Sequence, residues 1–274
     1  MQVDGSDEPV CSVSAGGWLA VVGLGPGDPV WLLPEAREVL SRATDLVGYQ
    51  TYLALVPPEL RQTPMLHSSD NGAELGRARL ALGLASRGRR VAVVSSGDPG
   101  VFAMASAVFE AQAAEDAPVA WQAIDIQVVP GVTAALATAA RVGAPLGHDW
   151  CCISLSDNLK PWSIVERRLV GALDADFVLA LYNPVSRHRP TRLADAFGLI
   201  RARRAAGTPI ILGRDVGRPG EQIRVAPLGE VELGECDMRT VIIVGSSTTR
   251  FGPAGPSGQR VFTPRWYPSD QTAG

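Results

Sequence analysis

The chain contains almost no lysine: Lys160 is the only one, and the other basic residues are arginines. Acidic residues outnumber basic ones, 28 to 25, so the net charge is −3 at pH 7. Because proteins that bind nucleic acid carry a basic surface, the composition gives no support to a nucleic-acid partner. Guanidinium groups bind carboxylates through two parallel hydrogen bonds, but a biased base composition explains the abundance of arginine more simply.

Cysteine is also scarce. The four residues, Cys11, Cys151, Cys152 and Cys236, include no CxxC pair. Cys151 and Cys152 are adjacent in an apolar run, so their side chains are expected on opposite faces of a strand. The pattern disfavours a metal or iron–sulfur site and favours free, mostly buried thiols in a reducing compartment.

Long apolar runs are missing as well, and none approaches the ~18 residues of a membrane-spanning helix. The first 16 residues contain acids and lack the basic segment and apolar core of a signal peptide. We therefore expect residues 1–16 to form a disordered tail, and the protein to be cytoplasmic and without a membrane partner.

From residue 17 onward, short apolar runs alternate with segments of helical length, which is typical of an α/β fold. The expected strands of the first half are Leu19–Leu24, Asp45–Tyr49, Arg90–Ser95 and Ile124–Val129. Those of the second half are Cys151–Leu155, Phe177–Tyr182, Pro209–Arg214 and Thr240–Gly245. Pro130 and Gly131 break the pattern between the halves. The sequence thus predicts two tandem α/β domains, 17–129 and 130–250, and a loose tail over 251–274.

The first of three glycine-rich loops, Gly23–Asp28 (GLGPGD), is only superficially a dinucleotide fingerprint. Asp28 replaces its third glycine, and the next helix is expected to start only near Pro34. Pro26 has no N–H to donate to a pyrophosphate. A nicotinamide site of the Rossmann type is therefore disfavoured, and no P-loop motif occurs.

The second loop, Ser95–Phe102 (SSGDPGVF), and the third, Val129–Ala135 (VPGVTAA), also follow expected strands. Open α/β sheets bind ligands at the carboxyl ends of their strands. Asp98 is a candidate acceptor for a ribose hydroxyl or a cationic group, and also a candidate cap of the next helix. Thr133 offers a hydroxyl or a second cap. The three loops together point to a ligand site more strongly than any one of them.

These three motifs, GLGPGD, SSGDPGVFAM and VPGVTAA, resemble those of the class III methyltransferases that act on tetrapyrroles. The resemblance covers residues 18–250. More specific segments resemble the branch of the family that builds the corrin ring: Gly48–Tyr52, Ser154–Trp162, Leu181–Pro184 and Gly213–Gly217.

The resemblance implies two α/β domains of the tetrapyrrole methylase type, with S-adenosylmethionine bound in a cleft between them and S-adenosylhomocysteine as product. It also implies a homodimer that methylates precorrin-3B at C17 and contracts the ring to precorrin-4 in cobalamin biosynthesis. The implied cofactor contacts are Pro26, Gly97, Asp98, Val101, Phe102, Thr133 and Ala134, with Tyr182 in place of a methionine of related enzymes and weaker contacts at Ile210 and Thr240.

Ring contraction requires a general base for a hydroxyl proton, and Asp157, Tyr182 and His148 are the candidates. Asp157 is explained more simply as a turn residue or helix cap ahead of Pro161, and His148 as a packed or solvated loop histidine. No metal is expected, because the methyl donor is already activated. Four arginines are candidates for binding substrate carboxylates, although each alone is more simply a surface charge: Arg187, Arg189, Arg214 and Arg218.

Three alternatives remain open. The first is a sister reaction on a cobalt-containing substrate or at another corrin position. The second is a non-catalytic module that binds a tetrapyrrole or a nucleotide, although such a module need not keep all three glycine loops. The third is a nicotinamide-dependent oxidoreductase, which binding of NADH would support.

Overall fold

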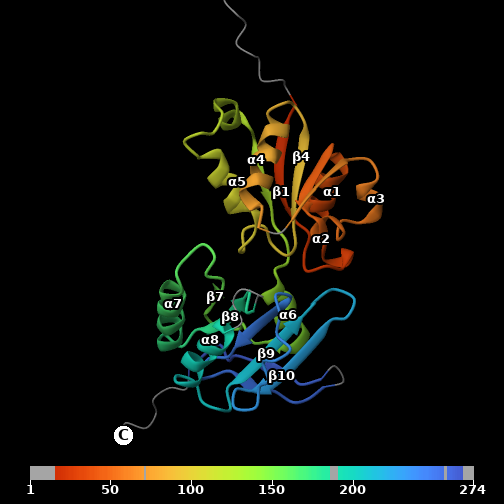
Figure 1. Ribbon diagram of the computed structural model, residues 1–274. Helices are drawn as coiled ribbons and strands as arrows, with labels where there is room; N and C mark the ends of the chain where they lie inside the picture. Colours follow the sequence, from red (N-terminus) through yellow and green to blue (C-terminus); the bar gives the residue numbers. More distant parts are fainter. Residues whose placement is uncertain (1–15, 71, 186–190, 256–257, 268–274) are drawn as a thin grey trace, which may run out of the picture. The chain divides into compact units, whose positions relative to one another are not determined.

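The computed structural model describes residues 16–70, 72–185, 191–255 and 258–267 (Figure 1). It divides the chain into two compact units, Met1–Val132 (unit 1) and Thr133–Gly274 (unit 2). Both contain a five-stranded sheet with helices, so the α/β class that the alternating pattern predicts is confirmed.

The sheet of unit 1 is entirely parallel and has the order β3-β2-β4-β1-β5. Its strands are β1 (Trp18–Gly23), β2 (Asp45–Tyr49), β3 (Met65–Ser69), β4 (Arg90–Ser95) and β5 (Ile126–Val129). The edge strand β3 was not expected from the sequence, because MLHSS is half polar and lacks the apolar run that marks a buried parallel strand.

Helices cover both faces of this sheet, so its central strands are buried on both sides. In β1, Leu19 and Val21 pack in the cluster that contains α4 (Glu74–Ala85) and α5 (Met104–Gln112), while Ala20 and Val22 pack in the cluster that contains α1 (Pro34–Arg42). Figure 1 shows these helices on the two sides of the sheet. The helical segments are α1 (Pro34–Arg42), α2 (Gln50–Leu53), α3 (Pro58–Arg61), α4 (Glu74–Ala85) and α5 (Met104–Gln112), with 3₁₀ turns η1 (Pro29–Trp31) and η2 (Val119–Ala123).

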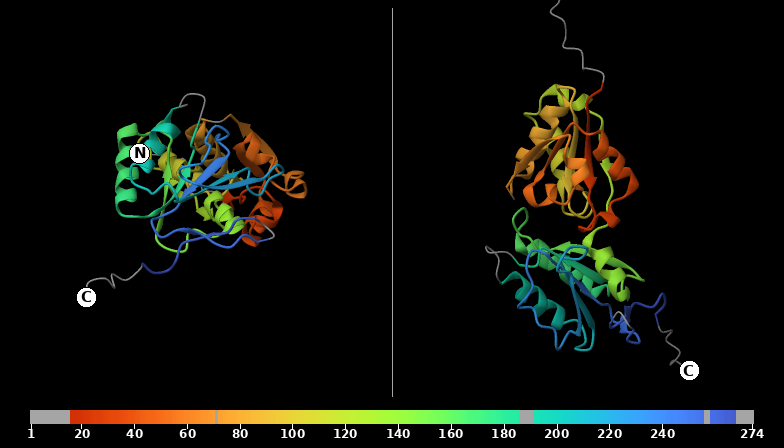
Figure 2. Two further views of the ribbon diagram at one scale, coloured as in Figure 1. Left: turned by 90° about the horizontal axis from the view of Figure 1, so that it is seen from below. Right: turned by 90° about the vertical axis from the view of Figure 1, so that its right-hand side faces the viewer.

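The sheet of unit 2 is mixed and has the order β10-β9-β11-β8-β7. Its strands are β7 (Trp150–Ser154), β8 (Val178–Tyr182), β9 (Pro209–Arg214), β10 (Gln222–Pro227) and β11 (Thr240–Val244). α7 (Trp162–Asp174) and α8 (Arg192–Arg201) pack on one face, and α6 (Ala134–Val142) packs on the other. The two helical layers can be followed from further directions in Figure 2.

Strand directions decide which residues of unit 2 share an edge of the sheet. β7 and β8 are parallel, with Ser154 beside Tyr182. β11 is antiparallel to both β8 and β9, with Thr240 beside Arg214. The carboxyl ends of β7, β8 and β9 therefore share one edge with the amino end of β11.

The last described residues pack onto unit 2, which differs from the loose tail expected after residue 250. β13 (Val261–Phe262) pairs with β12 (Arg250–Phe251) and with β6 (Gly143–Ala144). Val261 is fully buried, and the Thr263 hydroxyl donates to the Pro145 carbonyl oxygen over 2.5 Å. The prediction relied on the high Gly, Pro and Ser content of this segment. A few apolar and hydroxyl residues within it are sufficient to anchor it to unit 2.

Candidate functional site

The three glycine-rich loops of the sequence meet at the carboxyl edge of the unit 1 sheet. They follow β1, β4 and β5, which are adjacent strands. The first two are joined by a pair of backbone hydrogen bonds, from the Gly25 amide to the Gly97 carbonyl over 3.2 Å and from the Gly97 amide to the Gly25 carbonyl over 2.7 Å. Both glycines have φ near +70°, a conformation that disfavours any side chain. The two loops therefore form one connected backbone surface.

The third loop is packed against the first two at backbone contact. A Cβ atom on Gly131 would collide with the Gly97 carbonyl oxygen. A Cβ atom on Gly23 would lie 2.7 Å from the Gly131 amide nitrogen. Glycine is thus required here for close approach. We call this assembly, formed by loops 23–28, 96–103 and 130–132, the glycine platform.

Asp98 joins the second and third loops of the platform. Its Oδ1 accepts from the Gly100 amide at 2.8 Å, and its Oδ2 accepts from the Gly131 amide at 3.0 Å. The side chain does not cap α5, because that helix begins only at Met104 and its cap residue, Ala103, makes no side-chain cap bond. The sequence did not predict this hydrogen bond between two loops, because nothing in the motif spacing shows that Gly131 lies beside Asp98.

Phe102 lies two residues before the start of α5. Its φ is +53°, so it cannot be part of a right-handed helix, and its side chain is 51% exposed. Residues held in this region cluster at ligand sites, where the surrounding structure maintains the strain. Pro26 is buried, and Val101 is partly buried. The predicted cofactor residues of the first two loops thus all belong to the glycine platform.

In unit 2, the predicted residues Thr133, Ala134 and Tyr182 come together at the start of α6. The Ala135 amide donates to the Tyr182 hydroxyl oxygen over 2.9 Å, and that hydroxyl lies 2.7 Å from Thr133 Oγ1. Thr133 occupies the cap position of α6, but its side chain makes no cap bond. The phenol of Tyr182 satisfies a free helix-end amide instead, and so connects the end of β8 to α6.

The two predicted backbone contacts on β9 and β11, Ile210 and Thr240, lie apart in the sheet. In the antiparallel pair of β9 and β11, Thr240 lies beside Arg214 and Val244 lies beside Ile210. Four residues of a strand span about 13 Å, so Ile210 and Thr240 lie at opposite ends of the pair. Thr240 shares the edge of Tyr182, whereas Ile210 is fully buried in the core beneath α7 and α8.

Asp157 lies in the loop that follows β7, at the same edge as Tyr182. Its Oδ2 accepts from Arg192 Nε at 2.9 Å, and the Arg192 guanidinium lies 4.8 Å from the centre of the Trp162 ring. Asp157 is not a helix cap, because α7 starts after Pro161 and makes no side-chain cap bond. The ion pair raises the pKa of Arg192. The carboxylate is thus held in a fixed place at this edge.

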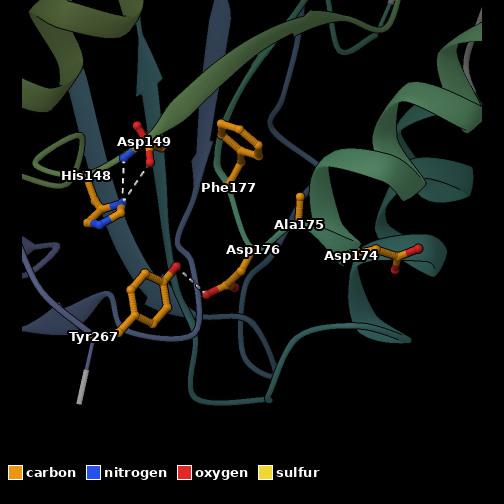
Figure 3. Close-up of a pocket in the computed structure, with 7 residues that line it drawn as sticks. All are labelled: His148, Asp149, Asp174, Ala175, Asp176, Phe177 and Tyr267. Atoms are coloured by element: carbon orange, nitrogen blue, oxygen red, sulfur yellow. Dashed lines mark hydrogen bonds and ion pairs between the residues drawn. The ribbon is translucent and has the colours of Figure 1, made fainter. Parts of the chain in front are cut away.

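His148 lies at the opposite edge of the unit 2 sheet, before the first residue of β7. The five residues of β7 cover about 16 Å, so the structure separates His148 from the other two base candidates. Its Nδ1 accepts from the Asp149 amide at 2.8 Å, and its ring packs edge-to-face on Tyr267, with centres 5.2 Å apart. These residues line a surface pocket of about 400 Å³, in which Tyr267 donates to Asp176 over 2.9 Å (Figure 3).

The four arginines predicted to bind substrate carboxylates differ in their positions and contacts. Arg214 already donates to Asp237, with Nη2 at 3.0 Å from Oδ2, and Arg239 shares the same carboxylate. Arg218 lies on the turn between β9 and β10. Arg187 and Arg189 fall outside the described residues.

Two kinds of structure are missing from the described ranges. They contain no group of three or more His, Cys, Asp or Glu side chains that could hold a metal ion. No helix within them is long and apolar enough to cross a membrane.

Comparison with known proteins agrees with this arrangement. The family model of tetrapyrrole (corrin/porphyrin) methylases matches residues 19–232. A precorrin-3B C(17)-methyltransferase of Sinorhizobium sp is 49% identical over 251 residues, which cover 92% of this chain and 97% of the relative. The cobalamin biosynthesis protein CobIJ of Mycobacterium tuberculosis is 51% identical over 92% of this chain, which spans only 49% of that longer protein.

A solved structure is also closely similar. The crystal structure of the methyltransferase CobJ superposes with a TM-score of 0.84 at 47% identity, covering 91% of this chain and all of the other. The residues that the family model matches, 19–232, include every loop of the glycine platform as well as Tyr182 and Asp157. The chain belongs to the tetrapyrrole (corrin/porphyrin) methylase family.

Proposed function

We propose that the protein uses S-adenosylmethionine to methylate precorrin-3B at C17 in cobalamin biosynthesis. The observation that carries the proposal is the glycine platform, whose three loops are locked together by contacts that only glycine permits. The 49% identity with a precorrin-3B C(17)-methyltransferase supports the choice of substrate and of ring position.

The platform fits this cofactor better than a nucleotide with phosphates. Pro26 lacks an N–H, and the carboxylate of Asp98 stands between two loops, which suits a ligand with a positive charge. Ser95 ends β4 just before the second loop, and its hydroxyl is fully buried without a partner among the described residues. A buried group without a partner calls for an explanation, and a bound ligand is one. When bound, S-adenosylmethionine supplies a methyl group already activated on a sulfonium.

The protein's own residues then have three tasks. The platform holds the donor in a fixed orientation, which lowers the entropic part of the barrier. Tyr182 and Thr133 fix the start of α6. For the contraction of the ring to precorrin-4, we assign the general base to Asp157, because it shares an edge with Tyr182 and is held by Arg192. The separate position of His148 argues against that residue.

The proposal includes a cytoplasmic homodimer. The three cysteines within the described ranges are free thiols, which suits a reducing compartment. The edge strand β3 exposes Met65 and Leu66 by 60% and 48%, which suits burial against a second copy. Light scattering coupled to size-exclusion chromatography measures the mass directly, and a monomer at micromolar concentration contradicts this part.

The function is tested by incubating the protein with S-adenosylmethionine and precorrin-3B and following product mass and absorption. The expected result is the gain of one methyl group together with the spectrum of a contracted ring. A parallel incubation with the cobalt-containing counterpart separates the two substrate classes, because turnover of that substrate alone would contradict the metal-free assignment. A protein that does not bind S-adenosylhomocysteine in calorimetry would contradict the methyltransferase proposal as a whole.

A further inference from the structure

A buried arginine adjoins the glycine platform, and no residue that the structure describes gives it a charged partner. Arg77 is 5% exposed and lies in the first turn of α4. Its Nε donates to the Ser69 hydroxyl over 2.9 Å, its Nη2 donates to the Asp70 carbonyl over 2.9 Å, and its Nη1 lies 3.1 Å from the Met104 sulfur. None of these acceptors, which are all that the described part of the chain offers it, is a carboxylate.

Burying the Arg77 guanidinium here is energetically unfavourable for three reasons. Removing a cation from water is unfavourable unless an anion compensates for it. The positive ends of the helix dipoles of α4 and α5 lie at the same place, since Met104 is the first residue of α5. A thioether is also a weak acceptor for a guanidinium N–H. Packing alone would be served better by an apolar side chain of similar length.

The contacts of the guanidinium connect three segments of unit 1. It joins the end of β3, the start of α4 and the first residue of α5. Met104 directly follows the second loop of the platform and lies two residues after the strained Phe102, so fixing Met104 fixes the end of that loop.

We infer that Arg77 is a positioning residue for the methyl donor, because it holds loop 96–103 in its binding geometry through Met104. The inference rests on the proposed function. It predicts that stability and cofactor affinity respond in opposite directions when the guanidinium is removed, since the cost of burial disappears together with the connection.

The test uses Arg77→Met, with Arg79→Met as the matched control. Arg79 lies on the same helix and pairs at the surface with Asp116. We expect Arg77→Met to unfold at the same temperature as the wild type or higher, but to bind S-adenosylhomocysteine about tenfold more weakly in calorimetry. The KM for S-adenosylmethionine should rise more than the KM for the tetrapyrrole. Arg77→Lys should recover part of the affinity, and Arg79→Met should bind normally.

Several outcomes would overturn the inference. It fails if Arg77→Met binds S-adenosylhomocysteine as tightly as the wild type, or if Arg79→Met weakens binding equally. If Arg77→Met does not fold, Met104→Leu removes the sulfur acceptor at nearly constant volume, and unchanged affinity in that variant contradicts the inference. Failure of the wild type itself to bind S-adenosylhomocysteine concerns the proposed function, so the two failures are distinguishable.

Discussion

Asp45 is a buried charge of unit 1 with three side-chain hydrogen-bonding partners, and its pairing predicts a dependence of stability on pH. Burial would raise its pKa, but hydrogen bonds from Arg89, His67 and Thr44 outweigh that effect and lower the pKa below its ordinary value. A carboxyl group with a depressed pKa stabilises the fold above its ordinary pKa of about 3.9 and loses this contribution as the pH falls through the lower, folded value.

Asp45→Asn should therefore reduce the free energy of unfolding by about 2 kcal/mol at pH 7, and should flatten the loss of stability below about pH 4. Urea unfolding of unit 1 between pH 3 and pH 7 measures both effects. Asp125→Asn, at an exposed position, is the control and should keep the wild-type slope. A steep acid slope that persists in Asp45→Asn would contradict the assignment.

The proposed assignment of Asp157 as the general base predicts that methylation and ring contraction can be separated. Asp157→Asn should still transfer the methyl group but slow contraction on the order of a hundredfold, because only the second process requires the base. Mass spectrometry reports the methyl group and absorption reports the contracted ring. Asp195→Asn removes the other carboxylate bonded to Arg192 and should leave contraction unchanged.

If Asp157→Asn contracts the ring at the wild-type rate, the base is another group. His148→Gln should behave like the wild type in both measurements, because His148 lies at the far edge of the sheet. Loss of contraction in His148→Gln would contradict the separation of the two edges.

The position of His148 shows what could not be predicted from the sequence at this scale. Asp157 and His148 are only nine residues apart in the chain, yet β7 runs between them and carries them to opposite edges. The hydroxyl of Tyr182 contacts the Ala135 amide and Thr133, partners that the sequence did not indicate. Such partners arise from packing between segments, which motif spacing does not encode.

At the scale of loops and helices, one glycine is required by close packing, whereas another has room for a side chain. Gly131 is confined by the backbones of Gly97 and Gly23, whereas Gly171 lies in α7 with open space where a Cβ would stand. Gly131→Ala should cost about 2 kcal/mol and weaken S-adenosylhomocysteine binding, because one of the loops must move. Gly171→Ala should stabilise α7 by about 0.5–1 kcal/mol and leave binding unchanged.

Chemical denaturation and calorimetry on the two variants check this contrast. Equal behaviour of Gly131→Ala and Gly171→Ala would mean that the platform tolerates a side chain and is not locked as described.

The elements themselves were largely predictable. Eight strands expected from apolar runs are present, with ends that differ by up to two residues. β3 and β10 were missed because their sequences, MLHSS and QIRVAP, mix polar and apolar residues as edge strands do. The direction of β11 could not be predicted from the sequence, because an apolar run does not reveal whether its strand is parallel to its neighbours. That direction separates Ile210 from Thr240.

At the scale of the whole chain, the described residues after Thr249, 250–255 and 258–267, are part of the fold of unit 2. Val261 packs with α6 and the sheet, and Thr263 lies 2.8 Å from the Thr249 hydroxyl. A chain that ends at Arg250 should lose at least about 2 kcal/mol of stability in unit 2, because it exposes the site of a buried valine. A chain that ends at Tyr267 keeps every contact described for this segment and should be as stable as the full chain.

Thermal unfolding of the two shortened chains measures the difference. Equal stability of the chain ending at Arg250 and the full chain would mean that β13 contributes nothing to the core of unit 2.

The glycine platform also limits how the protein can be re-engineered. Because Gly23, Gly97 and Gly131 occupy one another's space, substitutions at these three positions will not combine additively. A library that randomises a single loop will mostly sample clashes with the two unchanged loops. To change the cofactor preference, all three loops should be replaced together by the three matching loops of one related protein.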